Sequence, residues 1–250
     1  LRVLKALDGR PDLTDMLTNP WRVRRATGEG LSKEERDLKS FKVLDAPKQA
    51  ALAAAFEIVP TLLVVGPPGV GKTRLATEIV TRRFDRAPNS RMLICAQGHD
   101  ALNHLQEKVQ EALAVSGADK VLVVRSSTPE RQTRLPQEVE ARALDLLRSL
   151  ETSAGVAASP PSFGEAVKAL RISVEDSLER KADLMVSDRV ALGALASLLL
   201  DAADIVISTL NSRDVERLVE ARAQFDWVIV EEAARATGPE LAGALMLSGR

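Results

Sequence analysis

The residues best suited to chemistry form a glycine- and proline-rich loop between an apolar run and a helical pattern. The loop fits the pattern Gly-x-x-x-x-Gly-Lys-Thr and consists of Gly66, Pro67, Pro68, Gly69, Val70, Gly71, Lys72 and Thr73. Glycines let the backbone bend so that several N–H groups face phosphate oxygens, and the following helix adds a partial positive charge. Lys72 can then reach the β- and γ-phosphates, and the Thr73 hydroxyl suits Mg²⁺. The loop therefore predicts nucleoside triphosphate binding, and its flanking patterns disfavour a turn without a ligand.

Two adjacent acids, Glu231 and Glu232, follow a second apolar run at residues 227–230. Hydrolysis of a triphosphate needs one carboxylate for the metal ion and another for the attacking water. Neighbouring residues on a strand point to opposite faces, so the two acids can divide these tasks only if the strand ends there. The alternative is an acidic helix start that complements the helix dipole. We predict Glu231 as a metal ligand, and Lys72, Glu231 and Glu232 as the catalytic residues.

The composition indicates a globular protein without a strong charge. The chain has 250 residues, a net charge of −1 and one cysteine, Cys95, inside an apolar run that predicts a buried thiol. No run approaches the roughly 20 apolar residues that cross a bilayer, so we expect no membrane association and a cytoplasmic location. The first residue is not Met, which suggests a piece of a longer protein. Small basic clusters are candidate nucleic-acid contacts or solvated helix ends: Arg22, Arg24 and Arg25, and Arg82, Arg83 and Arg86.

Apolar runs alternate with helical patterns, which is typical of a parallel sheet covered by helices. The expected strands are residues 61–65, 91–96, 120–124, 204–208 and 227–231, and the expected helices between them include 72–83, 100–115 and 212–224. Residues 136–200 are helical in pattern and predict an insertion between two strands. The fold class is therefore α/β, with a mostly parallel sheet, helices on both faces and a helical insertion. We expect residues 46–250 to form the main domain, and residues 1–45 to be a leader, including a short helix at 1–7, or the remnant of a preceding subdomain.

The order of the motifs resembles that of superfamily 1 helicases, in the branch of the nonsense-mediated-decay RNA helicase and the replication nuclease-helicase. The resemblance covers about residues 45–250 and rests on Gln49 and on residues 66–73, 93–105, 205–212 and 228–240. It implies the first RecA-like motor domain, an AAA-type P-loop ATPase that uses ATP and Mg²⁺. It also implies that Gln49 reads the adenine edge and that nucleotide contacts run through the loop to Arg74.

The same resemblance suggests where nucleic acid would bind. Residues 93–105 are similar to a segment that touches the backbone of a strand, which makes Gln97, His99 and Asn103 candidate contacts. The family more often has Asn and Asp at the positions of His99 and Asn103. Ser208 and Thr209 resemble a further contact motif, although such hydroxyls also commonly cap helices. The implied partners are single-stranded DNA or RNA and a second RecA-like domain.

Two positions depart from the family pattern. Glu231 stands where the family usually has Asp, and Arg235 where it often has Gln, a residue that passes the nucleotide state to the second motor domain. We expect altered but not abolished activity, and weak turnover by this chain in isolation. The function predicted is an ATP-hydrolysing helicase or translocase motor. The alternatives are a P-loop NTPase that switches a protein partner and a nucleotide-binding module that does not hydrolyse.

Overall fold

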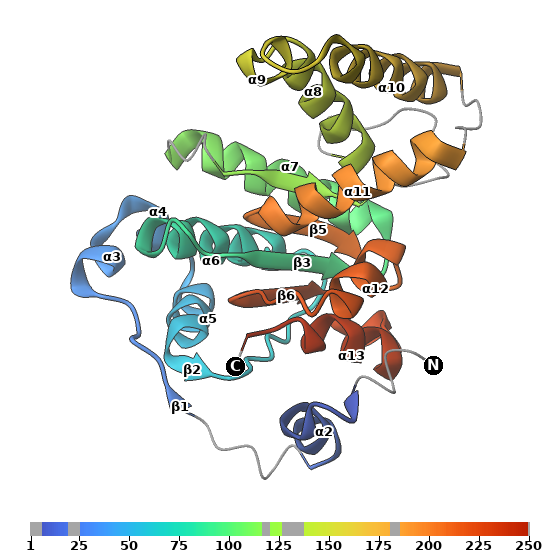
Figure 1. Cartoon of the computed structure of the whole chain (residues 1–250). Coiled ribbons are helices and arrows are strands. Elements are labelled where there is room, and N and C mark those ends of the chain that lie inside the picture. Colours follow the sequence, from blue (N-terminus) through green and yellow to red (C-terminus); the bar gives the residue numbers. More distant parts are fainter. Residues whose placement is uncertain (1–6, 20–25, 117–120, 127–137, 181–185, 250) are drawn as a thin grey trace.

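The computed structural model describes residues 7–19, 26–116, 121–126, 138–180 and 186–249. Its centre is a four-stranded parallel sheet in the order β4-β5-β3-β6 (Figure 1). The strands are β3 (Met92–Ala96), β4 (Val123–Arg125), β5 (Ile205–Thr209) and β6 (Trp227–Glu231). Ala96 at the end of β3 pairs in register with Thr209 and Glu231, so the carboxyl ends of three strands lie at one edge. The predicted α/β class with a parallel sheet is confirmed.

Helices cover both faces of this sheet. Successive side chains of a strand point to opposite faces, so these apolar strands present an apolar surface on each side. On one face, Met92 and Ile94 pack with α6 (Lys72–Arg86) and α7 (His99–Ser116). On the other face, Leu93 and Cys95 pack with α11 (Val186–Ala202), α12 (Arg213–Glu220) and α13 (Gly238–Met246). Cys95 is fully buried, as predicted, and burial raises the pKa of its thiol to about 12.

The strand expected at residues 61–65 is absent. The chain before the loop forms only the short β2 (Ile58–Val59), which pairs antiparallel with β1 (Ala26–Thr27). Leu63 and Val65 are 76% and 87% exposed. A strand needs a neighbour to complete its hydrogen bonds, and among the described residues 61–65 have no ladder partner. An apolar run alone therefore does not make this strand.

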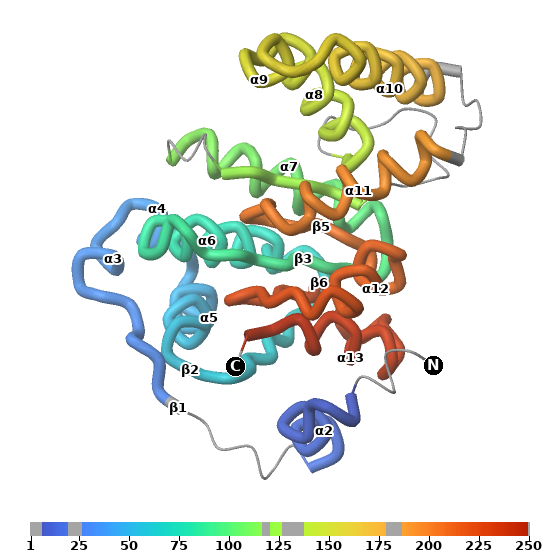
Figure 2. Tube along the Cα trace, in the orientation of Figure 1, coloured from blue at the N-terminus to red at the C-terminus, as the bar shows by residue number. Residues whose placement is uncertain are grey.

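Between β4 and β5, the described residues form helices and one isolated bridge from Glu138 to Arg125, in agreement with the helical pattern of residues 136–200. The helices are α8 (Val139–Glu151), α9 (Ala154–Ala157), α10 (Pro161–Arg180) and α11. Leu144 and Leu147 of α8 pack with Val167 and Val174 of α10 in a small separate core. In Figure 2, α8 to α10 stand beyond the β4 edge of the sheet. Residues 136, 137 and 181–185 lie outside the described part of the chain, and the boundaries of the insertion stay a prediction.

The leader follows the surface of the main domain in two places. Near its start, α2 (Pro11–Thr18) contacts α13, and Arg10 donates to the carbonyls of Met246 at 3.1 Å and Ser248 at 3.4 Å. Further on, α3 (Lys33–Asp37) and α4 (Lys39–Lys42) lie near α6 and α5 (Ala46–Glu57) (Figure 2). The helix expected at residues 1–7 and the cluster Arg22, Arg24 and Arg25 lie outside the described residues, apart from Leu7.

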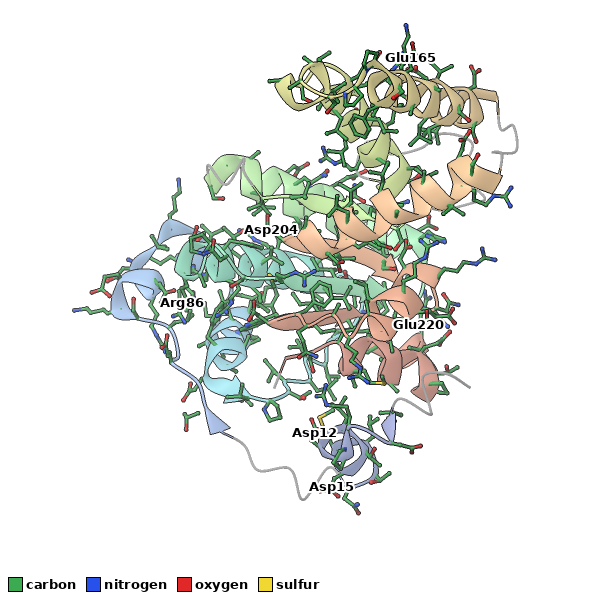
Figure 3. The ribbon with its side chains drawn as sticks, viewed as in Figure 1. Asp12, Asp15, Arg86, Glu165, Asp204 and Glu220 are labelled. Carbon is green, nitrogen blue, oxygen red and sulfur yellow. The ribbon has the colours of Figure 1, made fainter. Side chains whose placement is uncertain are left out.

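Two members of the second basic cluster, Arg82 and Arg86, bind the leader to α6, so neither a solvated helix end nor an open nucleic-acid patch describes these two. Arg86, which Figure 3 labels, forms an ion pair with Glu35, donates to the Gly30 carbonyl at 2.5 Å and lies 4.6 Å above the Phe56 ring. Arg82 is only 2% exposed and donates to the Glu35 carbonyl at 3.0 Å. The hydrogen bond from Arg86 lowers the pKa of Glu35 to about 2. We call Arg82, Arg86 and Glu35 the leader clasp.

No helix in the described ranges combines the length and apolar character needed to cross a membrane.

Candidate nucleotide-binding site

The glycine-rich loop leads directly into the first turn of α6. Gly69 and Gly71 have φ values of 79° and 83°, in the region that favours glycine, and Gly71 is the N-cap of the helix. The free N–H groups at this helix start can bind an anion. Lys72 folds back over the loop and donates to the carbonyls of Gly66 at 2.9 Å and Pro67 at 3.0 Å. The loop thus brings an ammonium group and a helix N-terminus together.

The end of β6 meets the start of α6 through a direct side-chain contact. Thr73 donates its hydroxyl hydrogen to Glu231 Oε1 over 2.8 Å, although 158 positions separate the two residues in the sequence. The second oxygen, Glu231 Oε2, is buried and has no hydrogen-bond partner among the described residues. A buried carboxylate oxygen without a donor is costly, and a cation would stabilise it. The sheet thus places the predicted metal ligands side by side.

Glu232 is the first residue after β6, and its side chain has a different partner from that of Glu231. Its backbone lies in the left-handed region, with φ of 53°, which is uncommon for a residue other than glycine. Its side chain accepts a hydrogen bond of 2.9 Å from Arg235 in the short 3-10 helix η2 (Ala233–Arg235). The strand therefore ends between the two acids, as their division of tasks requires. The two acids face different partners, and Arg235, one of the departures from the family pattern, holds the second acid.

Gln49 uses its amide nitrogen within the protein. Nε2 donates to the Leu44 carbonyl at 2.9 Å and to the Phe41 carbonyl at 3.3 Å, which ties the first turn of α5 to the end of α4. A bidentate contact with adenine needs both the nitrogen and the oxygen of the amide. Gln49 would have to release these carbonyls to make it, whereas its Oε1 can accept from an adenine amine without this change.

The serine and threonine at the end of β5 are buried. Ser208 is 1% exposed, and its hydroxyl lies 2.7 Å from that of Ser126 at the end of β4. It also contacts the hydroxyl of Ser212, which caps α12 by accepting from Val215 N at 3.1 Å. Thr209 is 8% exposed. A direct contact with a nucleic-acid strand would require the Ser208 hydroxyl to leave these partners.

The other candidate contacts lie near the carboxyl end of β3. Gln97 follows β3, while His99 and Asn103 occupy the first turns of α7, and all three are half-buried. They share the edge at which Glu231 ends β6, since β3 and β6 pair in parallel register. The fold therefore brings these three residues to the carboxyl ends of the strands, where Thr73 and Glu231 meet.

Sequence reasoning missed Lys48 at this site. Its side chain lies against Gly71, and its ammonium forms an ion pair with Asp45, the N-cap of α5. The position next to Gln49 on the first turn of α5 is the only sequence signal for it, and the P-loop pattern does not include it.

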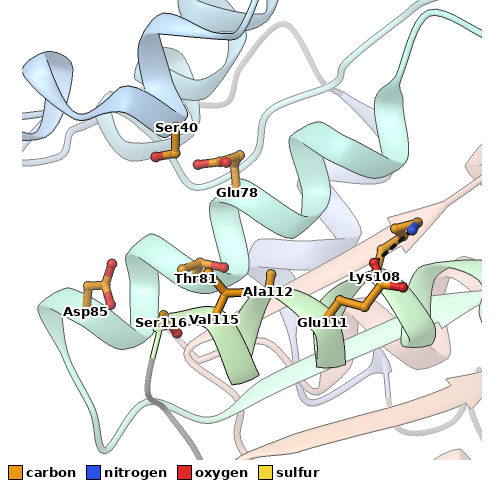
Figure 4. Close-up of a pocket in the computed structure, with 9 residues that line it drawn as sticks. All are labelled: Ser40, Glu78, Thr81, Asp85, Lys108, Glu111, Ala112, Val115 and Ser116. Carbon is orange, nitrogen blue, oxygen red and sulfur yellow. Dashed lines mark hydrogen bonds and ion pairs between the residues drawn. The ribbon is translucent and has the colours of Figure 1, made fainter.

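A cavity of about 420 Å³ lies elsewhere, between the later turns of α6 and α7 (Figure 4). Three acids, Glu78, Asp85 and Glu111, contribute to its lining. Its one lysine, Lys108, is bonded to Glu111 at 2.8 Å. Desolvation raises the pKa of Asp85, but the cavity still carries carboxylates that repel a triphosphate. This cavity is therefore unsuited to the nucleotide.

The parallel sheet, the loop before α6 and the acid at the end of β6 define a RecA-like P-loop domain. A family model described as "AAA domain" matches residues 43–250, and the chain belongs to this family.

Three relatives illustrate the similarity. Regulator of nonsense transcripts 1 of Caenorhabditis elegans is 29% identical over 190 residues, or 75% of this chain and 15% of that protein. DNA polymerase alpha-associated DNA helicase A of Schizosaccharomyces pombe is 25% identical over 211 residues, or 82% of this chain and 30% of that protein. RNA helicase aquarius of Mus musculus is 45% identical over 47 residues, or 19% of this chain and 3% of that protein. The resemblance to superfamily 1 helicases is confirmed, and the chain spans at most 30% of the length of these relatives.

Proposed function

We propose that this chain is the ATP-binding and ATP-hydrolysing motor domain of a superfamily 1 DNA or RNA helicase or translocase. One observation carries the proposal: the 2.8 Å contact between Thr73 and Glu231, which joins the P-loop to the acidic strand end. The contact supports a single site that can hold a phosphate chain and its metal ion together.

The donor set fits Mg²⁺, which prefers oxygen ligands. The Thr73 hydroxyl and the Glu231 carboxylate are neighbours, and the buried Glu231 Oε2 is suited to a cation or to its bound water. Mg²⁺ would neutralise negative charge on the β- and γ-phosphates when bound. The longer side chain of Glu231, in place of the usual Asp, already reaches Thr73 from the end of β6.

The remaining roles follow from the positions of the side chains. Lys72 leaves the loop carbonyls to bind the phosphates, and Gln49 Oε1 accepts from the adenine amine. Glu232 accepts a proton from the attacking water as the bond between the γ-phosphorus and its bridging oxygen breaks. For this, the Glu232 carboxylate must separate from Arg235, an exposed pair that costs little to open.

The similar proteins include both a DNA helicase and an RNA helicase. We therefore propose single-stranded nucleic acid as the class of partner, and a second RecA-like domain as the part of a longer protein that closes the site. The proposed contacts with the nucleic-acid backbone lie at the carboxyl ends of the strands and are Gln97, His99 and Asn103. Ser208 and Thr209 would take part only after becoming exposed, since both are buried.

Nucleotide binding and turnover test the proposal in separate assays. The chain should bind a fluorescent ATP analogue in the presence of Mg²⁺, and Lys72→Ala should remove most of this binding. In the longer protein, single-stranded DNA or RNA should stimulate ATP hydrolysis, and Glu232→Gln should abolish the stimulated turnover. Turnover that does not respond to either nucleic acid would contradict a motor function.

A second function, nucleotide binding without hydrolysis, is favoured by one observation. Glu232 lies in a left-handed conformation and is held by Arg235, so the candidate base is engaged elsewhere. Arg235→Gln restores the residue more usual in the family and separates the two functions. A motor should keep or increase its hydrolysis rate in this variant, whereas a module without hydrolysis should show no turnover before or after the change.

A further inference from the structure

Lys48 lies where the N-termini of α5 and α6 meet. A methyl group built on Gly71 would be 2.9 Å from Cε and 3.8 Å from Nζ of Lys48, so this side chain lies directly against the P-loop backbone. Gly71 is the N-cap of α6, next to the N–H groups that are free to bind an anion. A second ammonium, in addition to that of Lys72, is therefore present beside the phosphate cradle.

The present partner of this ammonium can be exchanged. Lys48 pairs with Asp45, whose side chain is 55% exposed, whereas the Lys48 side chain is only 21% exposed because the loop shelters it. Asp45 has a second task, since its Oδ1 accepts from Lys48 N at 3.0 Å and so caps α5. Exposed ion pairs of this kind contribute little, and a phosphate group offers the ammonium a stronger charge-assisted hydrogen bond.

Lys48 and Gln49 are also neighbours on the first turn of α5. The amide of Gln49 is fixed to the carbonyls of Phe41 and Leu44, which anchors this turn against α4. The turn is therefore held in place independently of the pair between Lys48 and Asp45. A lysine on an anchored turn can change its partner without moving the helix.

We propose that Lys48 is a second phosphate-binding lysine of this site, which releases Asp45 and contacts a phosphate oxygen when a nucleoside di- or triphosphate binds. The proposal rests on the proposed function, because it takes the P-loop to be a nucleotide site. It assigns Asp45 the role of a competitor that holds the ammonium until the phosphate arrives.

The test is a double-mutant cycle with ADP as the probe, measured by fluorescence of a labelled ADP and by competition with unlabelled ADP. Lys48→Met should weaken ADP binding about tenfold or more, the loss expected for a hydrogen bond to a charged group. Asp45→Asn should tighten binding by about twofold to fivefold, because Asn caps a helix as well as Asp but does not hold the ammonium. The double variant should behave like Lys48→Met alone.

Lys42→Met is the matched control, because it removes the same charge from an exposed side chain that pairs with Asp37 on the leader. It should leave ADP binding unchanged. A purely structural pair between Lys48 and Asp45 would instead make both single variants bind more weakly, and this result would overturn the proposal. If Lys48→Met does not fold, Asp45→Asn decides alone, since weaker or unchanged binding contradicts a competitor role.

Lys72→Met separates failure of this proposal from failure of the proposed function. If Lys72→Met loses ADP binding while Lys48→Met binds ADP as tightly as Lys42→Met, the role of Lys48 is overturned and the P-loop site remains supported. Equal binding by the unaltered chain and Lys72→Met, or no binding by either, would overturn both.

Discussion

The leader clasp gives a pH-dependent contribution to stability that a single substitution can isolate. Glu35 pairs with Arg86 of the P-loop helix and also closes a capping box with Ser32, whose backbone N–H donates to it at 2.7 Å. Glu35→Gln removes the charge but keeps the capping box, because Gln serves equally at this position. The loss of stability in this variant therefore reports mainly the ion pair with Arg86, the largest cause of the lowered pKa of Glu35.

The magnitude follows from the pKa of Glu35, which Arg86 lowers from 4.5 to about 2. This change corresponds to at most about 3–4 kcal/mol of stability at neutral pH. One-fifth of each side chain is open to solvent, which screens the pair, so we expect Glu35→Gln to cost about 1–2 kcal/mol at pH 7. Because the folded-state pKa is the lower one, the contribution is complete above the unfolded pKa and disappears as the pH falls towards 2. Roughly half or more of the difference should be lost at pH 3.

Urea unfolding of both proteins at pH 7 and pH 3 measures this difference. Glu34→Gln, on the same helix but outside the clasp, is the matched control. Hydrogen bonds from its own backbone N–H and from Ser32 also lower the pKa of Glu34, so this variant should show a pH-dependent difference that is clearly smaller than that of Glu35→Gln. Equal stability of the unaltered chain and Glu35→Gln at pH 7 would refute the reasoning. So would a difference of the same size at both pH values, since a packing defect does not titrate with a carboxylate.

Three further predictions concern the site and the core. Thr73→Val should reduce the Mg²⁺-dependent part of nucleotide affinity while leaving binding without Mg²⁺ nearly unchanged, as titrations with and without EDTA would show; an equal loss in both would place Thr73 outside the metal site. Replacing the exposed Leu63 and Val65 by Thr should change the unfolding free energy by no more than about 0.5 kcal/mol each. Truncating a buried leucine costs about 2–5 kcal/mol, so a larger loss in urea unfolding would show that this run packs in a sheet. Cys95 should resist thiol reagents at pH 8 in the folded chain and react once urea unfolds it, because the thiol is fully buried with a pKa of about 12; rapid labelling of the folded chain would contradict this.

Patterns of neighbouring residues predicted some strands correctly and one strand wrongly. Residues 227–231 form β6 with the expected bounds, because an apolar run ends there at two acids. Residues 61–65 have an equally apolar pattern but form no strand, because pairing depends on a neighbour that a run of residues does not reveal. The P-loop was recognisable for a different reason, since its glycines and lysine occur at a fixed spacing.

The site was harder to predict wherever the partner of a side chain lies far away in the sequence. Arg82 and Arg86 look like a basic helix end, but Glu35 and the Phe56 ring, both distant in the sequence, make them part of the leader clasp. The contact between Thr73 and Glu231 could be expected from the family order of motifs, whereas Lys48 could not, because only the folded chain brings it to Gly71.

The leader and the nucleotide site belong to one packed unit, which argues against treating residues 26–45 as a linker. Leu31, Phe41 and Leu44 of this segment pack with α5 and α6 in a single apolar cluster, and Trp227 and Ile229 of β6 close that cluster from the sheet side. The hydrogen bond from Thr73 to Glu231 crosses the same boundary between α6 and β6. Any change that loosens the leader therefore acts on the position of α6 relative to β6, and hence on the distance between the phosphate loop and its acid. We therefore expect the leader to influence the proposed nucleotide binding through this packing.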